Sequence, residues 1–446
     1  MGENNNMRLR NGTWLGFVAA GLVGLLFGIG MSVNADKNPN VSLPIEDIRS
    51  LAQVIEHIKK SYVEEVDDQE LLENAIDGML SGLDPHSTYL KAEDFSDLRE
   101  DTSGKFGGLG IEVQMDENGY VRVVAPIDET PAARAGILAG DLITFLDGEQ
   151  VKGLSLTEAV DIMRGDPGEP IVLTVVRKGV NKPLQIEIVR DVIKVTSIKS
   201  EVLEEEFGYI RIRQFQERTG QDLVAALKNL QKEAELKGLI LDLRNNPGGV
   251  LSASVDVVDA LLSEGLIVYT EGRVANSESK YFATSSNPSN NLSLVVLING
   301  GSASASEIVA GALQDHKRAI IMGTQSFGKG SVQTILPLSE DRAIKLTTAR
   351  YYTPNGRSIQ AQGIVPDITV ERAKLTKQTG AEFYKEADLN GHLDNPNGNE
   401  SGNEVSSKER EEEVSAEEKP LSERDYQLYE ALNLLKGIAI ALSLKI

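Results

Sequence analysis

The stretch LKGLILDLRNNPGGVLSASVDVVDALL, which runs from Leu236 to Leu262, decides the fold. It begins with an apolar run typical of a buried strand and then turns through NNPGG, residues Asn245 to Gly249. Apolar residues at helical spacing follow the two glycines. A strand, a glycine-rich turn and a helix in this order form the building unit of layered α/β proteins.

The same unit recurs on both sides of this stretch. Downstream, the apolar run SLVVLIN is followed by GGS and then by the helical pattern ASASEIVAGALQDH. Upstream, the strand pattern GYIRIRQF precedes the helical pattern GQDLVAALKNLQKEAE, and LIVYTEG is a further strand pattern between the two glycine turns. This alternation predicts a layered, mostly parallel α/β core over residues 195–372.

The two glycine turns predict a functional site. If their strands are parallel neighbours, both turns open at the same edge of the sheet, where α/β proteins place their sites. Each turn leads into a helix N-terminus, which has free N–H groups and a positive dipole end. One N–H group from each turn could therefore hold an oxyanion.

A serine at such a junction needs a partner that takes its proton. Ser302, Ser304 and Ser306 all lie at the start of the second helix, and the pattern alone does not separate them. Lys329 comes one short strand later, in GTQSFGKGSVQ, so its loop could return to the same edge. A working base needs a pKa of roughly 7 to 8, about three units below the ordinary lysine value, which is on the order of 4 kcal/mol. Burial beside Phe327 could lower the pKa of Lys329 by this amount.

Other interpretations of these residues stay open on sequence grounds. Ser304 and Glu307 match a capping box, so Ser304 could simply cap its helix, and Lys329 could be an ordinary exposed lysine. GTQSFGKG is also close to a phosphate-binding loop, in which the lysine would hold a nucleotide as a cation. That loop needs Ser or Thr directly after the lysine and then a helix, whereas Gly330 and a strand pattern follow here.

Residues 103–191 have a different pattern. GLGIEVQMDENGYVRVVAP predicts a β-hairpin, EPIVLTVVRKG and PLQIEIVRD predict a second one, and SLTEAVDIMRG predicts a helix between them. Short strands with one helix across them indicate a small β-rich module. Residues 44–100, which precede it, contain two amphipathic helical patterns.

The N-terminus predicts export. Residues 1–13 carry Arg8 and Arg10, and Trp14 to Met31 then run without a charge. Residues 14–33 could be a transmembrane anchor or, because VNA ending at Ala35 resembles a cleavage site, a signal peptide. In either case the positive-inside rule places residues 1–13 in the cytoplasm and Asp36 onward outside it. No ATP pool is expected there, which disfavours the nucleotide interpretation.

Composition excludes several classes of protein. The 446 residues include 67 acidic and 45 basic ones, a formal net charge of -22, which argues against a nucleic-acid partner. There is no cysteine, so disulfides and thiol catalysis are excluded, and the four histidines show no metal-ligand spacing. Residues 394–420 predict a disordered acidic linker, and residues 421–446 a C-terminal helix with a Ser-x-x-Asp start at Ser422.

Several motifs together resemble one protease family. NGGSASASEIVAGALQDH followed by GTQSFGKGSVQ is similar to the core of the carboxy-terminal processing proteases, also called tail-specific proteases. GLDPHSTYL, FGGLGIEV, LDLRNNPGG and YYTPNGRSIQAQGIVPD are similar to other stretches of that family, in its order. The resemblance covers about Ile45 to Val370. It implies a ClpP/crotonase-like α/β protease core with an inserted PDZ domain and an N-terminal helical segment.

The resemblance also implies roles for single residues. Ser304 would be the nucleophile, Lys329 the general base and Gln333 the residue that orients the lysine. The N–H groups of Gly249 and Ala305 would hold the oxyanion. Asp315 matches an acid common in the family, and we assign it no chemical role.

The β-rich module resembles a PDZ domain, which takes up a peptide as an added strand and holds its terminal carboxylate on backbone N–H groups. The matching peptide-binding residues would be Gly108, Leu109, Gly110 and Ile111. Arg164 is a candidate for linking peptide capture to the catalytic site.

These observations predict a bacterial serine endopeptidase that works outside the cytoplasm, anchored or released at its N-terminus, and cleaves proteins near their C-termini. It would need no metal or organic cofactor. Amphipathic helices at both ends of the chain could pair two copies into a homodimer. The competing hypothesis is a non-catalytic PDZ scaffold that delivers proteins to another protease.

Overall fold

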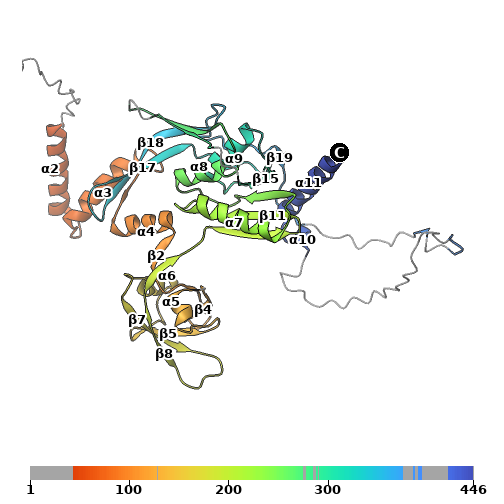
Figure 1. Cartoon of the computed structure of the whole chain (residues 1–446). Helices are drawn as coiled ribbons and strands as arrows, with labels where there is room; N and C mark the ends of the chain where they lie inside the picture. The colour runs from red at the N-terminus through yellow and green to blue at the C-terminus, as the bar shows by residue number, and fades with distance from the viewer. Residues whose placement is uncertain are drawn as a thin grey trace, which may run out of the picture. The chain divides into compact units, whose positions relative to one another are not determined.

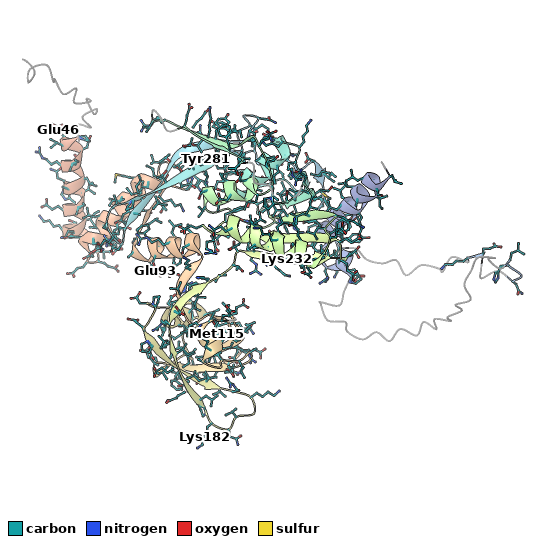
Figure 2. All side chains as sticks on the ribbon, viewed as in Figure 1. Glu46, Glu93, Met115, Lys182, Lys232 and Tyr281 are labelled. Carbon is teal, nitrogen blue, oxygen red and sulfur yellow. The ribbon has the colours of Figure 1, made fainter. Side chains whose placement is uncertain are left out.

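The computed structural model describes residues 44–127, 129–274, 278–284, 288–289, 291–374, 385–386, 390–393 and 420–444, drawn as a cartoon in Figure 1 and with side chains in Figure 2. The expected anchor or signal peptide, residues 14–33, lies outside them, as does nearly all of the expected linker, residues 394–420. Over the described parts of the chain, no helix is long and apolar enough to cross a membrane. The chain divides into two compact units, Met1–Ala75 and Ile76–Ile446.

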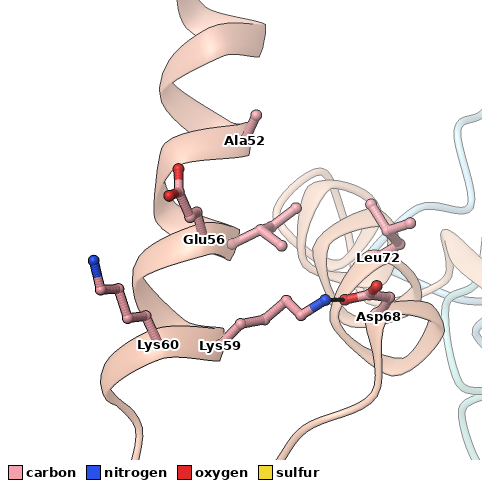
Figure 3. A pocket seen from close by; sticks show the side chains of 7 residues that line it. Ala52, Glu56, Lys59, Lys60, Asp68 and Leu72 are labelled. Carbon is pink, nitrogen blue, oxygen red and sulfur yellow. Dashed lines mark ion pairs between the residues drawn. The ribbon is translucent and has the colours of Figure 1, made fainter.

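The first unit contains α2 (Ile45–Ser61) and the start of α3 (Asp68–Ser81), as the amphipathic patterns predict. Lys59 and Asp68 form an ion pair of 2.6 Å between the two helices, beside a shallow pocket (Figure 3). No residue of α2 is buried, and its apolar side chains are exposed, namely Ile45, Ile48, Leu51 and Val54. An apolar face left open in this way is a surface that a partner can cover.

The second unit is built on a six-stranded sheet. Its order is β10-β11-β12-β15-β16-β19, and every pairing from β11 onward is parallel. The strands are β10 (Ile198–Leu203), β11 (Phe207–Ile212), β12 (Gly238–Asp242), β15 (Ser293–Ile298), β16 (Ile320–Gly323) and β19 (Ile368–Thr369). The predicted layered, mostly parallel core is therefore present.

Helices cover both faces of this sheet, so its strands are apolar on both sides (Figure 1). On β12, Leu239 and Leu241 pack toward α7 (Thr219–Glu233), α8 (Leu251–Asp259) and α9 (Ala305–Asp315). Ile240, between them, packs toward α11 (Tyr426–Ser443) on the opposite face. This alternation explains why the decisive stretch reads as a continuous apolar run.

A second, antiparallel sheet lies beside the core. It contains β1 (Thr88–Leu90), β13 (Leu266–Gly272), β14 (Ser279–Phe282), β17 (Ser331–Pro337) and β18 (Ala343–Tyr352). LIVYTEG forms β13, so this strand belongs here and not to the parallel sheet. The reason is that β12 pairs directly with β15, which leaves no place between them for an intervening strand.

The β-rich module forms as predicted, with α4 (Ala92–Ser103) leading into it. Its elements are β2 (Lys105–Gly108), β3 (Ile111–Met115), β4 (Val121–Pro126), α5 (Pro131–Arg134), β5 (Leu142–Leu146), β6 (Glu149–Gln150), α6 (Leu156–Met163), β7 (Pro170–Val176), β8 (Leu184–Val189) and β9 (Asp191–Lys194). In Figure 2, Met115 marks the end of β3 and Lys182 the β7–β8 connection. The module has its own apolar core, which includes Val121, Ile143 and Leu173.

The C-terminal helix begins later than the pattern predicts. Ser422 lies in a short helix, α10 (Leu421–Arg424), and the chain then breaks at Asp425, where φ is -147° and ψ is 88°. The Asp425 carboxylate accepts a hydrogen bond from the Leu428 N–H and caps α11. It also binds the Arg244 guanidinium at 2.7 Å, and these two contacts explain the break.

Candidate active site

The two glycine turns meet at one edge of the sheet, as predicted. β12 and β15 are parallel neighbours, with Asp242 opposite Leu297, so the turns that follow them start side by side. The Asn246 carbonyl oxygen accepts hydrogen bonds from the Ala303 N–H and the Ser306 hydroxyl, each at 3.0 Å. A Cβ atom at Gly248 would lie 2.8 Å from the Cβ of Ser304, so only glycine allows this approach.

The structure separates the three serines that the pattern could not. The Ser302 hydroxyl is buried and donates to the Leu243 carbonyl at 2.8 Å, and the Ser306 hydroxyl donates to the Asn246 carbonyl. Both therefore fasten the turns to each other. Ser304 is half-buried and lies between them, at the point where α9 begins. Of the three, Ser304 is the one whose hydroxyl is not used to hold these turns together.

Ser304 has an unusual backbone conformation, with φ at 55° and ψ at -112°. Such a conformation costs on the order of 1–3 kcal/mol for a residue with a side chain, and it clusters at functional sites. Its N–H donates to the Glu307 carboxylate at 2.7 Å, which is one half of the expected capping box. The Glu307 N–H in turn donates to the Ser304 carbonyl oxygen at 2.8 Å.

Glu307 connects the serine to the lysine loop. The side chain is fully buried, and its Oε2 accepts from the N–H of Ser304 at 2.7 Å and from the N–H of Lys329 at 2.9 Å. Its Oε1 accepts from the Ser326 hydroxyl at 2.6 Å and the Gly328 N–H at 2.7 Å. One carboxylate thus holds the two residues together from within. These five residues, Ser304, Glu307, Ser326, Gly328 and Lys329, are hereafter the Glu307 hub.

Lys329 is half-buried, not an exposed surface lysine. Burial lowers the pKa of its amine, and the nearby positive charge of Lys345 lowers it further, against the weaker opposing effects of Asp84 and Glu307. The side chain of Phe327, which was expected to bury the amine, is itself 64% exposed. The direction of the pKa shift is the one expected from burial.

Gln333 lies on β17 and makes contacts other than the one expected. Its amide nitrogen donates to the hydroxyls of Ser331 at 2.9 Å and Thr347 at 3.3 Å. Among the described residues, no hydrogen bond joins Gln333 to Lys329. The amide nitrogen is thus held by β17 and β18, which leaves the amide oxygen as the group that could face the amine.

A second set of contacts anchors these strands to the GLDPHS stretch. The Asp84 carboxylate accepts from the hydroxyls of Ser87 at 2.7 Å and Thr347 at 3.1 Å, and the Thr347 N–H donates to Ser87 at 3.1 Å. His86 lies in the same turn. Burial lowers its pKa, and the positive charge of Lys329 lowers it further. The stretch therefore reaches the lysine side of the site.

The two expected oxyanion donors are available. Gly249 is held between Phe215 and Val250, because the Phe215 N–H donates to the Gly248 carbonyl and the Val250 N–H donates to the Phe215 carbonyl, each at 2.8 Å. Ala305 is the first residue of α9, whose N-terminal N–H groups have no partner within the helix. In the described parts of the chain, neither the Gly249 nor the Ala305 N–H donates a hydrogen bond.

The structure also places the lysine loop, Asp315 and His316, the histidine nearest to Ser304 in the sequence. Gly330 is followed by β17, a strand, so the lysine loop lacks the helix that a phosphate-binding loop requires. His316 lies at the far end of α9 and bonds the Leu266 carbonyl, away from Ser304. Asp315, at the same end, pairs with Arg357 and accepts from the Asn355 N–H, so its contacts are structural.

The β-rich module contains a groove of about 220 Å³ between β3 and α6. The four expected peptide-binding residues line it, together with Phe106, Val113, Val160, Met163 and Arg164. β3 is the edge strand of its sheet, so an extended peptide could pair with it. In the described structure, the N–H groups of Leu109 and Gly110 donate no hydrogen bond, while their carbonyls accept from Ala132 and Ile127.

Arg164 connects the groove to α4. Its guanidinium lies 3.2 Å from the Glu100 carboxylate and 3.7 Å from Asp97, and it stacks over the Phe106 ring at 5.3 Å. Its Nε is buried and has no hydrogen-bond partner in the described structure. Arg164 thus contacts both the groove and α4, the helix that leads into the module.

Sequence reasoning missed several of these residues. Glu307 was considered only as a cap, because the capping-box spacing does not show that its side chain is buried. Tyr351 is buried on β18, and burial raises its pKa well above the ordinary value. The Tyr351 hydroxyl lies near the Ser304 side chain and forms no hydrogen bond in the described structure. No sequence pattern indicates this tyrosine.

Comparison with known proteins identifies the family of the chain. Residues 206–370 match peptidase family S41, residues 107–188 match the PDZ domain, and residues 30–94 match the N-terminal domain of the activating protease CtpB. The carboxy-terminal-processing protease of Bartonella bacilliformis is 51% identical over 88% of this chain and 89% of its own length. The carboxy-terminal processing protease CtpA of Bacillus subtilis is 35% identical over 76% of this chain and 72% of its own length.

Among solved structures, the photosystem II D1 C-terminal processing protease is similar, with 32% identity, a TM-score of 0.43, and coverage of 72% of this chain and 86% of that one. The α/β core and the module it carries define a serine endopeptidase with a PDZ domain. The chain belongs to the carboxy-terminal processing proteases of family S41, as its motifs predict.

Proposed function

We propose that Ser304 is the nucleophile of this protease and that Lys329 is its general base. We also propose that the enzyme cleaves proteins near their C-termini outside the cytoplasm. The main support for a Ser304–Lys329 dyad is that one carboxylate oxygen accepts hydrogen bonds from the backbones of both residues. Oε2 of Glu307 accepts from the N–H groups of both residues, so the two backbone nitrogens lie within two hydrogen-bond lengths of each other. The lowered pKa of Lys329 suits a base that must be neutral.

In this mechanism the Ser304 hydroxyl gives its proton to the Lys329 amine while its oxygen attacks the scissile carbonyl carbon. The resulting oxyanion accepts hydrogen bonds from the N–H groups of Gly249 and Ala305. Collapse breaks the peptide bond, and the leaving amine takes the proton from Lys329. Water then attacks the acyl-enzyme while its proton passes to Lys329, and the Ser304 oxygen leaves as it takes that proton back from Lys329, which restores the free hydroxyl and the neutral amine. Gln333 orients the amine without adding a charge that would favour its protonated form.

The PDZ groove would present the substrate. Gly108, Leu109, Gly110 and Ile111 line a groove beside an open strand edge, which suits an extended peptide that ends in a carboxylate. Arg164 contacts both this groove and Glu100 on α4. We therefore propose that Arg164 couples peptide binding in the groove to the protease core through its contact with α4.

Export and pairing are part of the same proposal. The apolar run of residues 14–33 behind a basic start supports an anchor or signal peptide, and hence a site of action outside the cytoplasm of a bacterium. The exposed apolar side chains of α2 and of the end of α11, such as Leu51 and Ile440, support a homodimer.

A cleavage assay on a labelled peptide with a free C-terminus tests the dyad. We expect wild type to cleave, and Ser304→Ala and Lys329→Arg to be inactive while circular dichroism shows a native fold. Arginine keeps the charge of lysine but cannot give up its proton. Substantial cleavage by Lys329→Arg would refute the base assignment. If wild type also fails to cleave, a PDZ scaffold is favoured, and a dependence on ATP would favour the nucleotide-binding hypothesis.

A further inference from the structure

A second polar cavity lies at the carboxyl edge of the parallel sheet, on the side that α11 covers. Its volume is about 210 Å³, well above the roughly 10–15 Å³ that one water needs. Four arginines from separate elements line it, and they define what is hereafter the arginine pocket: Arg211 on β11, Arg244 after β12, Arg372 after β19 and Arg424 on α10.

The positive charge in this pocket is only partly offset by its own carboxylates. Arg244 is fully engaged, because its guanidinium binds Asp242 and Asp425, each at 2.7 Å, and also Gln427 at 3.1 Å. The other three arginines form no ion pair within 4.0 Å in the described structure. Of the residues that line the cavity, Asp425 is the one carboxylate beside four guanidinium groups, while Asp242 binds Arg244 from outside the lining, so cations are in excess around the cavity.

Arg211 is the member of the pocket that most needs a ligand. The side chain is half-buried, and its Nε is shielded from solvent with no hydrogen-bond partner in the described structure. A buried donor without a partner costs about 1–3 kcal/mol, so it calls for an explanation such as an unseen ion. Guanidinium groups match the planar pairs of oxygens on carboxylate and phosphate.

The rim of the pocket is also built from polar groups. Asn245 and Asn299 line it, and their side chains bond each other at 2.9 Å across the ends of β12 and β15. Asn245 adopts a φ of 56°, which a hydrogen-bonded asparagine tolerates better than most residues. The lining residues thus come from the ends of strands and from α10 and the start of α11.

We propose that the arginine pocket binds a small polyvalent oxyanion, a molecule with two or more carboxylate or phosphate groups. Arg211, Arg372 and Arg424 would supply the unpaired guanidinium groups, while Arg244 keeps its bonds to Asp242 and Asp425. The pocket is separate from the Glu307 hub, which lies toward α9 on the other face of the sheet. The proposal does not depend on the Ser304–Lys329 mechanism.

Calorimetric titration of the full chain tests this, with inorganic pyrophosphate and citrate as the probes and ionic strength held constant. We expect saturable binding of at least one probe at a single site. Arg211→Gln and Arg372→Gln should each weaken it by about tenfold, since each removes a charge-assisted contact. Arg213→Gln is the matched control, because Arg213 is exposed, lies two positions from Arg211 and is outside the pocket lining. The probe that binds distinguishes phosphate from carboxylate chemistry.

The proposal is overturned if neither probe binds saturably at millimolar concentration. It is also overturned if binding survives the Arg211→Gln, Arg372→Gln double variant, or if Arg213→Gln weakens binding as much as the pocket variants do. Arg372 is exposed, so its variant should fold and decides the question even if Arg211→Gln does not. Because the readout is heat of binding, a failure here is distinct from a failure of the proposed catalytic dyad.

Discussion

The Glu307 hub and the Asp242–Arg244–Asp425 cluster lie near the same sheet edge, yet they satisfy buried carboxylates in opposite ways. Glu307 receives only backbone N–H groups and a hydroxyl, and burial raises its pKa although these hydrogen bonds act against the rise. Burial acts to raise the pKa of Asp425, but the Arg244 guanidinium, the Leu428 N–H and the charge of Arg211 together lower it. The Glu307 hub is therefore stabilised by neutral hydrogen-bond donors, and the Asp242–Arg244–Asp425 cluster by ion pairs.

The difference explains why each centre suits its place. The Glu307 hub joins the serine and lysine loops through neutral N–H and hydroxyl donors, so no ion pair is needed to bring the two loops together. At the other centre no group needs to lose a proton, so ion pairs can fasten α11 to the end of β12. Buried pairs of this kind specify geometry more reliably than they add stability.

Breaking the Glu307 hub should have the largest effect. Glu307→Ala removes the acceptor that both the Ser304 and Lys329 backbones share, so we expect at least about a 100-fold loss of kcat, in line with misplaced catalytic groups. Glu307→Gln keeps one carbonyl oxygen and should retain more activity. Peptide cleavage at saturating substrate, with thermal unfolding as the check on folding, measures this. An Ala variant with wild-type kcat would show that the hub does not position the dyad.

Breaking the charged cluster should affect stability first. Arg244→Gln leaves the fully buried Asp242 without its cation, so we expect the free energy of unfolding to fall by about 3–5 kcal/mol. Urea denaturation measures the loss, and Arg213→Gln serves as the exposed control. A loss of stability no larger than that of the control would mean that the Tyr209 hydroxyl and the remaining donors stabilise the buried Asp242 carboxylate without Arg244.

The Asp242–Arg244–Asp425 cluster should also make the free energy of unfolding fall at acidic pH. Because the pKa of Asp425 is lower in the folded state, its contribution is present above the unfolded value of about 3.9 and is lost as pH falls through the folded value. Asp425→Asn should therefore flatten the fall in unfolding free energy below about pH 4, as measured by urea denaturation at each pH. An unchanged slope in the variant would contradict the paired state of Asp425.

The smallest effects should come from the serines that flank Ser304. Ser302→Ala and Ser306→Ala each remove one buried hydrogen bond to a backbone carbonyl, so we expect about 1–2 kcal/mol of lost stability with peptide cleavage retained. Complete loss of cleavage in either variant, with a native circular dichroism spectrum, would mean that the nucleophile had been misassigned.

The layers of the fold could be predicted from the sequence because the spacing of apolar residues indicates which segments are strands, which are helices and which faces are buried. Alternate residues of β12 pack on opposite faces, and this is why its run is apolar throughout. The placement of β13 in a second sheet was not predicted, since the strand pattern alone does not name its partner. Asp425 was read as part of a helix start, because its bond to Arg244, far away in the sequence, is invisible to a local pattern.

At the site, sequence patterns predicted where the two glycine turns lie, but they did not show which of the three serines is placed to react. Ser304 differs from Ser302 and Ser306 only through contacts with distant carbonyl groups. Glu307 and Tyr351 were missed for a related reason, because a role that depends on burial leaves no mark in residue type or spacing. Family resemblance, not physical reasoning from the sequence, singled out Ser304.

Titration of the Lys329 amine tests the central claim most directly. Lysine side chains labelled with ¹³C can be followed by NMR in the Ser304→Ala protein, and the Lys329→Arg variant identifies the Lys329 signal by its loss. We predict a midpoint clearly below the ordinary lysine pKa of about 10.4. A Lys329 midpoint at or above that ordinary value would contradict a neutral amine acting as the base.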